Sequence, residues 1–119
     1  MAVNIIGTGS YVPKNVADNQ LLSTIVDTDD EWIRQRTGIK ERHLSSGSKE
    51  GTSFMAIEAA KVALEHADVS AEEMDLIIVA TASADTYVPS TACQVQGELG
   101  AIRATCFDLN AACSGFLFA

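Results

Sequence analysis

An unbroken apolar run, residues 76–80, is the clearest hydrophobic pattern along the 119-residue chain. A run without alternation is typical of a strand covered on both faces. A second strand is predicted over 104–109, where β-branched and aromatic residues gather. Between them, Pro89-Ser90-Thr91 predicts the start of a helix that ends before Gly100. This alternating β/α order predicts a sheet with helices packed on it.

The sequence before residue 76 predicts further helices and strands. A long helix is expected over 52–68, capped by Thr52, and its narrow polar stripe indicates packing on more than one side. Other expected elements are a strand at 3–6, a helix at 18–26, a helix from the capping box at 28–31 to Gly38, and a single turn from a second capping box at 70–73. The expected fold class is therefore α/β, layered, with helices on both faces of the sheet.

A glycine turn, residues 7–10, follows the first predicted strand and invites a dinucleotide-binding interpretation. The phosphate fingerprint requires a third glycine where Val12 stands, and a helix where Pro13 intervenes. We therefore interpret this segment as a strand, a turn and a loop.

Charge and composition narrow the function classes. A net charge of −8 argues against nucleic acid as a partner, although Arg34, Arg36, Lys40 and Arg42 form one basic cluster that could meet a phosphate. The sequence has neither a signal-peptide pattern nor a long apolar run, so we expect no membrane association. Three unclustered cysteines indicate a reducing compartment, the cytoplasm, and no Cys–His spacing predicts a metal site.

Cys113 is the leading candidate for chemistry. It lies where the strand at 104–109 gives way to an apolar helix, and its neighbours are small. Free N–H groups at a helix start favour a thiolate, and the pattern resembles in its mechanics the elbow that presents a nucleophilic serine. We infer covalent acyl transfer through Cys113. The alternative is a buried, unreactive thiol, which we adopt for Cys93 and Cys106.

Trp32 and Arg36 lie four residues apart, on one face of a predicted helix. Trp32 is either a core or interface tryptophan or a ring that stacks an adenine while nearby cations hold its phosphates. His43 and His66 are interpreted as structural.

Four motifs, in order, resemble β-ketoacyl-acyl carrier protein synthase III. The resemblance implies a thiolase-like fold, with residues 1–119 as the N-terminal part of one domain that stops within the helix of the nucleophile. The motifs are Ile5-Ile6-Gly7-Thr8-Gly9-Ser10-Tyr11-Val12-Pro13, Val26-Asp27-Thr28-Asp29-Asp30-Glu31-Trp32-Ile33, Arg36-Thr37-Gly38-Ile39-Lys40-Glu41-Arg42-His43 and Asn110-Ala111-Ala112-Cys113-Ser114-Gly115-Phe116.

The resemblance also implies a reaction. An acyl group passes from coenzyme A to Cys113, and malonyl-acyl carrier protein is then decarboxylated and condensed with it, which initiates type II fatty acid synthesis. Thr28, Trp32 and Arg36 match residues that contact the nucleotide end of coenzyme A, which is a substrate rather than a cofactor. Val88 stands where many members carry a phenylalanine that crosses a homodimer interface into the acyl pocket, so we expect a larger or branched primer to be tolerated.

The family's catalytic histidine and asparagine match nothing in residues 1–119, so we expect the isolated chain to be inactive. Two alternatives stay open. One is a thiolase-fold relative that uses another starter or transfers the acyl group to an oxygen or amine. The other is a non-catalytic fragment that binds coenzyme A or forms a dimer.

Overall fold

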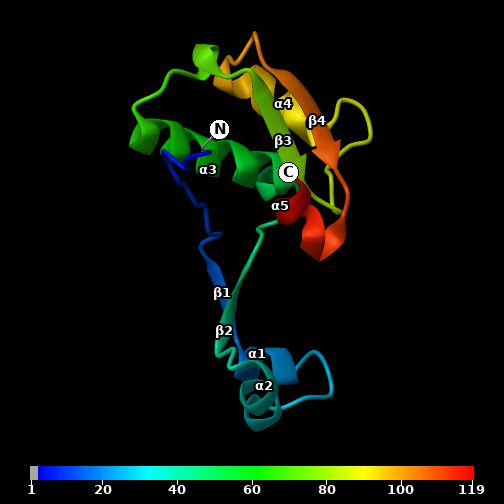
Figure 1. Cartoon of the computed structure of the whole chain (residues 1–119). Coiled ribbons are helices and arrows are strands. Elements are labelled where there is room, and N and C mark those ends of the chain that lie inside the picture. Colours follow the sequence, from blue (N-terminus) through cyan, green and yellow to red (C-terminus); the bar gives the residue numbers. More distant parts are fainter. Residues whose placement is uncertain (1–2) are drawn as a thin grey trace. The chain divides into compact units, whose positions relative to one another are not determined.

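The structure, a computed structural model, describes residues 3–119 and divides the chain into two compact units (Figure 1). The main unit contains the residues up to Tyr11 together with Lys49–Ala119, and the inserted unit is Val12–Ser48. No helix in the described part of the chain has both the length and the apolar character needed to cross a bilayer.

The main unit is built around a parallel pair of strands, β3 (Leu76–Ala80) and β4 (Thr105–Leu109), which lie side by side in Figure 1. The helix α4 (Thr91–Leu99) connects them and packs on both, and α3 (Thr52–Ala67) packs against α4. Short turns of 3-10 helix complete the unit: η1 (Ser48–Glu50), which begins at the boundary, η2 (Ala71–Glu73) and η3 (Ala112–Ser114). The buried residues cluster in α4 and in the turn after it, at Thr91, Ala92, Val95, Ala101 and Ala104.

Local signals in the sequence locate α4 and η2 correctly. The Ser90 side chain caps α4 by accepting from the backbone N–H of Cys93, and Gly100 ends the helix with φ of 73°. Ser70 and Glu73 form the expected capping box of η2.

The start of α3 differs from the prediction. Its N-cap is Gly51 rather than Thr52, and Asp85 from a distant loop caps the helix instead. The Asp85 carboxylate accepts from the backbone N–H groups of Thr52 at 2.8 Å and Ser53 at 2.7 Å, and from the Ser53 hydroxyl at 2.6 Å. The hydroxyl of Ser53 contributes most to lowering the pKa of Asp85. These bonds tie the loop after β3 to the N-terminus of α3.

The strand predicted over residues 3–6 is wrong, because residues 3–14 contain no strand. Residues 3–11 instead run alongside helix α3. A Cβ at Gly7 would collide with the carbonyl oxygen of Ala63, and one at Gly9 with that of Ala59. The two glycines therefore permit a close approach to helix α3, which the β-branched run at 3–6 alone does not indicate.

The inserted unit pairs β1 (Asn15–Asp18) with β2 (Glu41–Leu44) in antiparallel register and carries α1 (Asn19–Ser23) and α2 (Asp30–Thr37). The sequence did not predict either strand, and α1 is shorter than the helix expected to reach residue 26. Asp18 caps α1 as predicted, and Gly38 ends α2 with φ of 74°. The cap of α2 is Asp29 rather than Thr28, because the Asp29 carboxylate accepts from Trp32 N at 2.7 Å.

A buried asparagine organises the inserted unit. Asn19 is 1% exposed, and its Nδ2 donates to Asp30 Oδ1 at 2.8 Å and to the carbonyl oxygen of Ile39 at 2.9 Å. Its Oδ1 accepts from Arg42 Nη2. Arg42 also donates to the carbonyl oxygens of Ala17 and Asp18. This network joins both strands to both helices, so Arg42 is engaged within the unit.

Candidate functional site

Cys113 lies in an exposed turn between β4 and α5 (Gly115–Phe118), at the red end of the chain in Figure 1. The strand, turn and helix expected around this residue are all present. The thiol is within η3, directly before α5, rather than in the first turn of an α-helix. The solvent exposure of Cys113 argues against the interpretation of an inert, buried thiol.

The backbone around Cys113 is tightly folded. Ala112 has φ of 44°, a left-handed conformation that non-glycine residues seldom adopt and that is found preferentially at functional sites. Gly115 is buried, and a Cβ there would lie 2.9 Å from the Cβ of Ala80 at the end of β3. The small residues that flank Cys113 therefore let this turn pack against the sheet.

Asp108 anchors the strand that leads to Cys113. Its two carboxylate oxygens accept from the backbone N–H groups of Thr91 at 2.8 Å and Ala92 at 2.7 Å, at the N-terminus of α4. Sequence analysis missed Asp108, although an acid inside an otherwise apolar strand is the signal that could have found it. Hydrogen bonds from α4 to Asp108, as well as apolar packing, therefore hold β4 against α4.

A cavity of about 580 Å³ lies beside this strand, within the main unit. Asp108 and Cys106 from β4 line one part of it, and the loop after β3, with Asp85 and Tyr87, lines another. Val88 lies in the same loop and is 86% exposed. Cys113 does not line this cavity.

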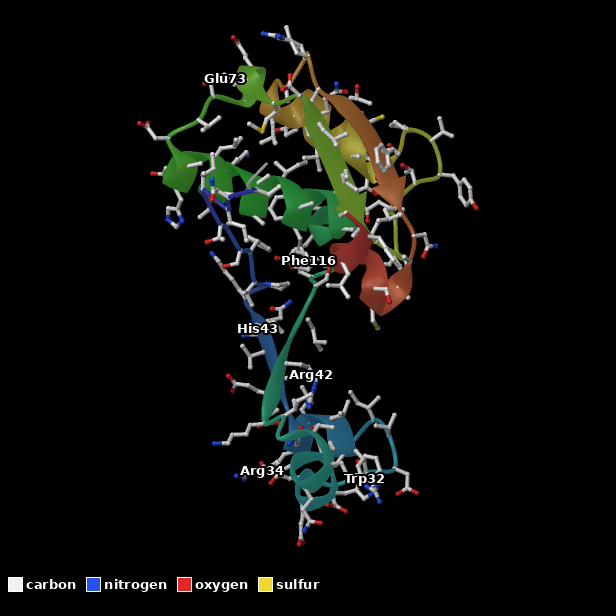
Figure 2. All side chains as sticks on the ribbon, in the orientation of Figure 1. Trp32, Arg34, Arg42, His43, Glu73 and Phe116 are labelled. Carbon is white, nitrogen blue, oxygen red and sulfur yellow. The ribbon has the colours of Figure 1, made fainter. Side chains whose placement is uncertain are left out.

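In the inserted unit, Trp32 and Arg36 stack on one face of α2, as their spacing predicts. The Arg36 guanidinium carbon lies 5.1 Å from the centre of the Trp32 ring. Trp32 is 53% exposed within the described chain, so it is not a core residue of the inserted unit. Figure 2 shows Trp32 and Arg34 pointing away from α2 in different directions, and Arg34 pairs with Asp30 at 3.5 Å. Within the basic cluster of the sequence, Arg34 is therefore paired with Asp30, whereas Arg36 lies over the Trp32 ring.

The side chain of Thr28 has a hydrogen-bonding group that nothing in this unit satisfies. Its Oγ1 is buried and has no hydrogen-bond partner. A buried hydroxyl without a partner is costly and calls for an explanation. Thr28 lines a cavity of about 490 Å³ together with Trp32 and with residues of α1, of α2 and of the loop between them, namely Leu22, Val26, Asp27, Asp29 and Ile33. A ligand in this cavity would meet the aromatic ring of Trp32 and the side chain of Thr28.

The two histidines bond to backbone carbonyl groups in their own units. His43 Nδ1 lies 2.6 Å from the oxygen of Pro13, and His66 Nδ1 lies 2.8 Å from the oxygen of Thr8. Both contacts fit the structural role that the sequence suggests. Within residues 3–119, no cluster of His, Cys, Asp and Glu could hold a metal ion.

Comparison with known proteins gives consistent results. The chain is 60% identical over 116 residues to β-ketoacyl-acyl carrier protein synthase III of Clostridium botulinum (strain Langeland / NCTC 10281 / Type F), covering 98% of this chain and 35% of that protein. It is 58% identical over 117 residues to the protein of the same name from Clostridium novyi (strain NT), covering 98% and 36%. No family model matches the chain.

Solved structures also resemble the chain, in sequence and in fold. A crystal structure of 3-oxoacyl-acyl carrier protein synthase III from Aquifex aeolicus VF5 superposes with a TM-score of 0.92 at 55% identity, covering 97% of this chain and 37% of that one. The priming β-ketosynthase from the R1128 polyketide biosynthetic pathway gives 0.90 at 38% identity, covering 96% and 34%. The chain thus spans about a third of the length of the curated relatives it matches. These similarities confirm the resemblance that the motifs indicate: the chain is similar to β-ketoacyl-acyl carrier protein synthase III over about a third of such a protein, with the corresponding part of the thiolase-like fold.

Proposed function

We propose that the full-length protein condenses an acyl-coenzyme A with malonyl-acyl carrier protein to give a β-ketoacyl-acyl carrier protein, the first condensation of type II fatty acid synthesis. The acyl group is carried on Cys113. The observation that carries this proposal is the exposed thiol of Cys113, in a strained turn between strand and helix, within a chain 60% identical to a protein named β-ketoacyl-acyl carrier protein synthase III.

The residues of the turn account for the acyl-transfer half of the reaction. The Cys113 sulfur attacks the thioester carbonyl, and the new C–S bond leaves an oxyanion to which the backbone N–H of Cys113 donates. The oxyanion collapses, coenzyme A leaves as a thiolate and takes up the proton lost by Cys113. After malonyl decarboxylation, the carbanion attacks the acyl-cysteine carbonyl and displaces the Cys113 thiolate.

The reaction itself can be tested with the full-length gene product, an acyl-coenzyme A and malonyl-acyl carrier protein. We expect carbon dioxide release and a β-ketoacyl-acyl carrier protein, detected by mass spectrometry, only when both substrates are present. Transfer of the acyl group to an oxygen or amine without carbon dioxide release would contradict this function.

A second candidate function is condensation on the same fold with a different acyl-coenzyme A as primer, one that serves a polyketide pathway rather than fatty acid synthesis. It is favoured by the similarity, at 38% identity, to a priming β-ketosynthase of a polyketide pathway. Competition between short, long and branched acyl-coenzyme A primers in one reaction distinguishes the two candidates, because each product retains the mass of its primer.

For the inserted unit, we propose that it binds the nucleotide end of coenzyme A. The Trp32 ring offers a face for the adenine, and the adjacent Arg36 guanidinium offers a cation for phosphate. Thr28 lines the same cavity as Trp32, and rotation of its side chain would bring the buried, unpaired Oγ1 into hydrogen-bond reach of the ligand.

Replacing Trp32 with alanine is expected to raise the KM for acyl-coenzyme A by about tenfold with little change in kcat, because the lost stacking acts on binding rather than on the reacting carbonyl. Steady-state kinetics on the full-length protein measure this effect. Trp32→Phe, which keeps a ring, should recover much of the affinity. Equal KM values for Trp32→Ala and the parent protein would contradict the assignment.

The Thr28→Val variant separates a binding role for this hydroxyl from a purely structural one. It keeps the shape and removes an unpaired buried hydroxyl, so thermal stability should stay the same or rise while the KM for acyl-coenzyme A rises. An unchanged KM would show that the hydroxyl does not meet the substrate.

Val88 is proposed to set the size of the acyl pocket across the interface of a homodimer, since its side chain is 86% exposed within the described chain. We expect the parent protein to accept branched primers and Val88→Phe to lower kcat/KM for them at least about tenfold relative to acetyl-coenzyme A, because the larger ring fills the pocket. Primer competition measures the ratio. A strong preference of the parent protein for acetyl-coenzyme A would contradict this role.

A further inference from the structure

Two cysteines that sequence analysis set aside as inert lie in direct contact. Cys93 in α4 and Cys106 in β4 place their Sγ atoms 3.2 Å apart. Both side chains are half-buried, and both belong to the main unit. Neither takes part in the acyl transfer proposed for Cys113.

We infer that Cys93 and Cys106 form a reversible redox site, in which a peroxide converts the two thiols into a disulfide that links α4 to β4. The inference is independent of the proposed condensing activity, because it depends only on this pair and its surroundings.

The geometry requires only a small movement. An S–S bond is about 2.0 Å long, so the two sulfurs must approach by little more than an ångström from their 3.2 Å separation. Neighbouring bonds already hold the helix and the strand together at this point. Gln96 Nε2 donates to the carbonyl oxygen of Ala104 at 2.6 Å, and the Cys106 thiol donates to Gln96 Oε1 at 3.4 Å. The two cysteines therefore face each other across a fixed helix–strand contact.

The surroundings distinguish the two thiols. A hydrogen bond with the Ser90 side chain contributes most to lowering the pKa of Cys93, whereas the contact with Cys93 raises the pKa of Cys106. The lower pKa favours a thiolate at Cys93, which lies in contact with Cys106. Cys106 also lines the cavity of about 580 Å³ beside β4, which offers a path for a molecule as small as a peroxide.

The chemistry balances in two steps. The thiolate of one cysteine of the pair attacks one oxygen of hydrogen peroxide, the O–O bond breaks, and the leaving hydroxide takes a proton to become water. The sulfur of the other cysteine then attacks the resulting sulfenic acid, which loses hydroxide, and the thiol proton of that second cysteine completes the second water. The two sulfurs lose two electrons in total, and the peroxide gains them. A dithiol reductant reverses the linkage by exchange.

Tryptic peptide mapping of the full-length protein tests the inference, because the chain can be cut after Arg103, between Cys93 and Cys106. After treatment with hydrogen peroxide and alkylation, we expect a disulfide-linked peptide pair that carries Cys93 on one side and residues from 104 onward on the other. Dithiothreitol should abolish the pair and restore two alkylated peptides.

Cysteine variants identify the linked atoms, since Cys113 lies on the same peptide as Cys106. The linked pair should disappear in Cys93→Ser and in Cys106→Ser and persist in Cys113→Ser. Circular dichroism confirms that each variant is folded. Absence of the linked pair in the parent protein, its persistence in folded Cys106→Ser or its loss in folded Cys113→Ser would each overturn the inference.

Discussion

Cys113→Ser is expected to lower kcat/KM for condensation by more than about a thousandfold, because a serine hydroxyl at this position is a far weaker nucleophile than a thiolate and removal of a nucleophile costs orders of magnitude. The side chains are nearly the same size, so the turn of Ala112 and Gly115 should fold unchanged. Condensation assays on the full-length protein under reducing conditions measure the loss.

Cys93→Ser is the matched control for this prediction. It makes the same chemical change at a half-buried cysteine outside the turn and should retain most of the activity when a reductant is present. Equal losses in both variants would point to a general structural effect. If iodoacetamide alkylated Cys113 near neutral pH no faster than a free thiol, the non-catalytic alternative would gain support.

Asn19→Ala is expected to destabilise the inserted unit by about 1–3 kcal/mol, since it removes the hydrogen bonds of a fully buried amide and creates a small cavity. The carbonyl of Ile39 and one oxygen of Asp30 lose their donor, and Arg42 loses an acceptor. Native-state hydrogen exchange of the β1 and β2 amides measures the free energy of opening of this unit within the full-length protein.

Gln20→Ala provides a control on the same helix. Gln20 is exposed and follows Asn19 directly, so its replacement should change the opening free energy by no more than about 0.5 kcal/mol. Similar effects of the two substitutions would show that the buried network contributes little. The KM for acyl-coenzyme A should rise in Asn19→Ala only to the extent that the unit opens.

Short-range signals explain what the sequence could predict. The cap at Ser90 and the glycine at Gly100 delimit α4 because both act within one helical turn. The same holds for the strand, turn and helix around Cys113, where a β-branched segment is followed by small residues and an apolar run. The stacking of Arg36 on Trp32 follows from helical spacing alone.

The features that the sequence could not predict depend on contacts between residues far apart in the chain. Asp85 caps α3 from more than thirty positions away, and the cap of α4 by Asp108 depends on the fold of the whole β-α-β unit. The run at 3–6 has strand propensity but pairs with no strand within the described chain. It leads instead into a segment that runs alongside helix α3. Similarly, the contact between Cys93 and Cys106 exists only once α4 has packed on β4.

The attachment point of the acyl group is the most direct test. The full-length protein is mixed with an acyl-coenzyme A in the absence of malonyl-acyl carrier protein, quenched in acid and digested, and its peptides are sequenced by mass spectrometry. The expected result is one acyl group in thioester linkage on Cys113, which hydroxylamine removes. An acyl group on any other residue, or no covalent acyl-protein at all, would contradict the account.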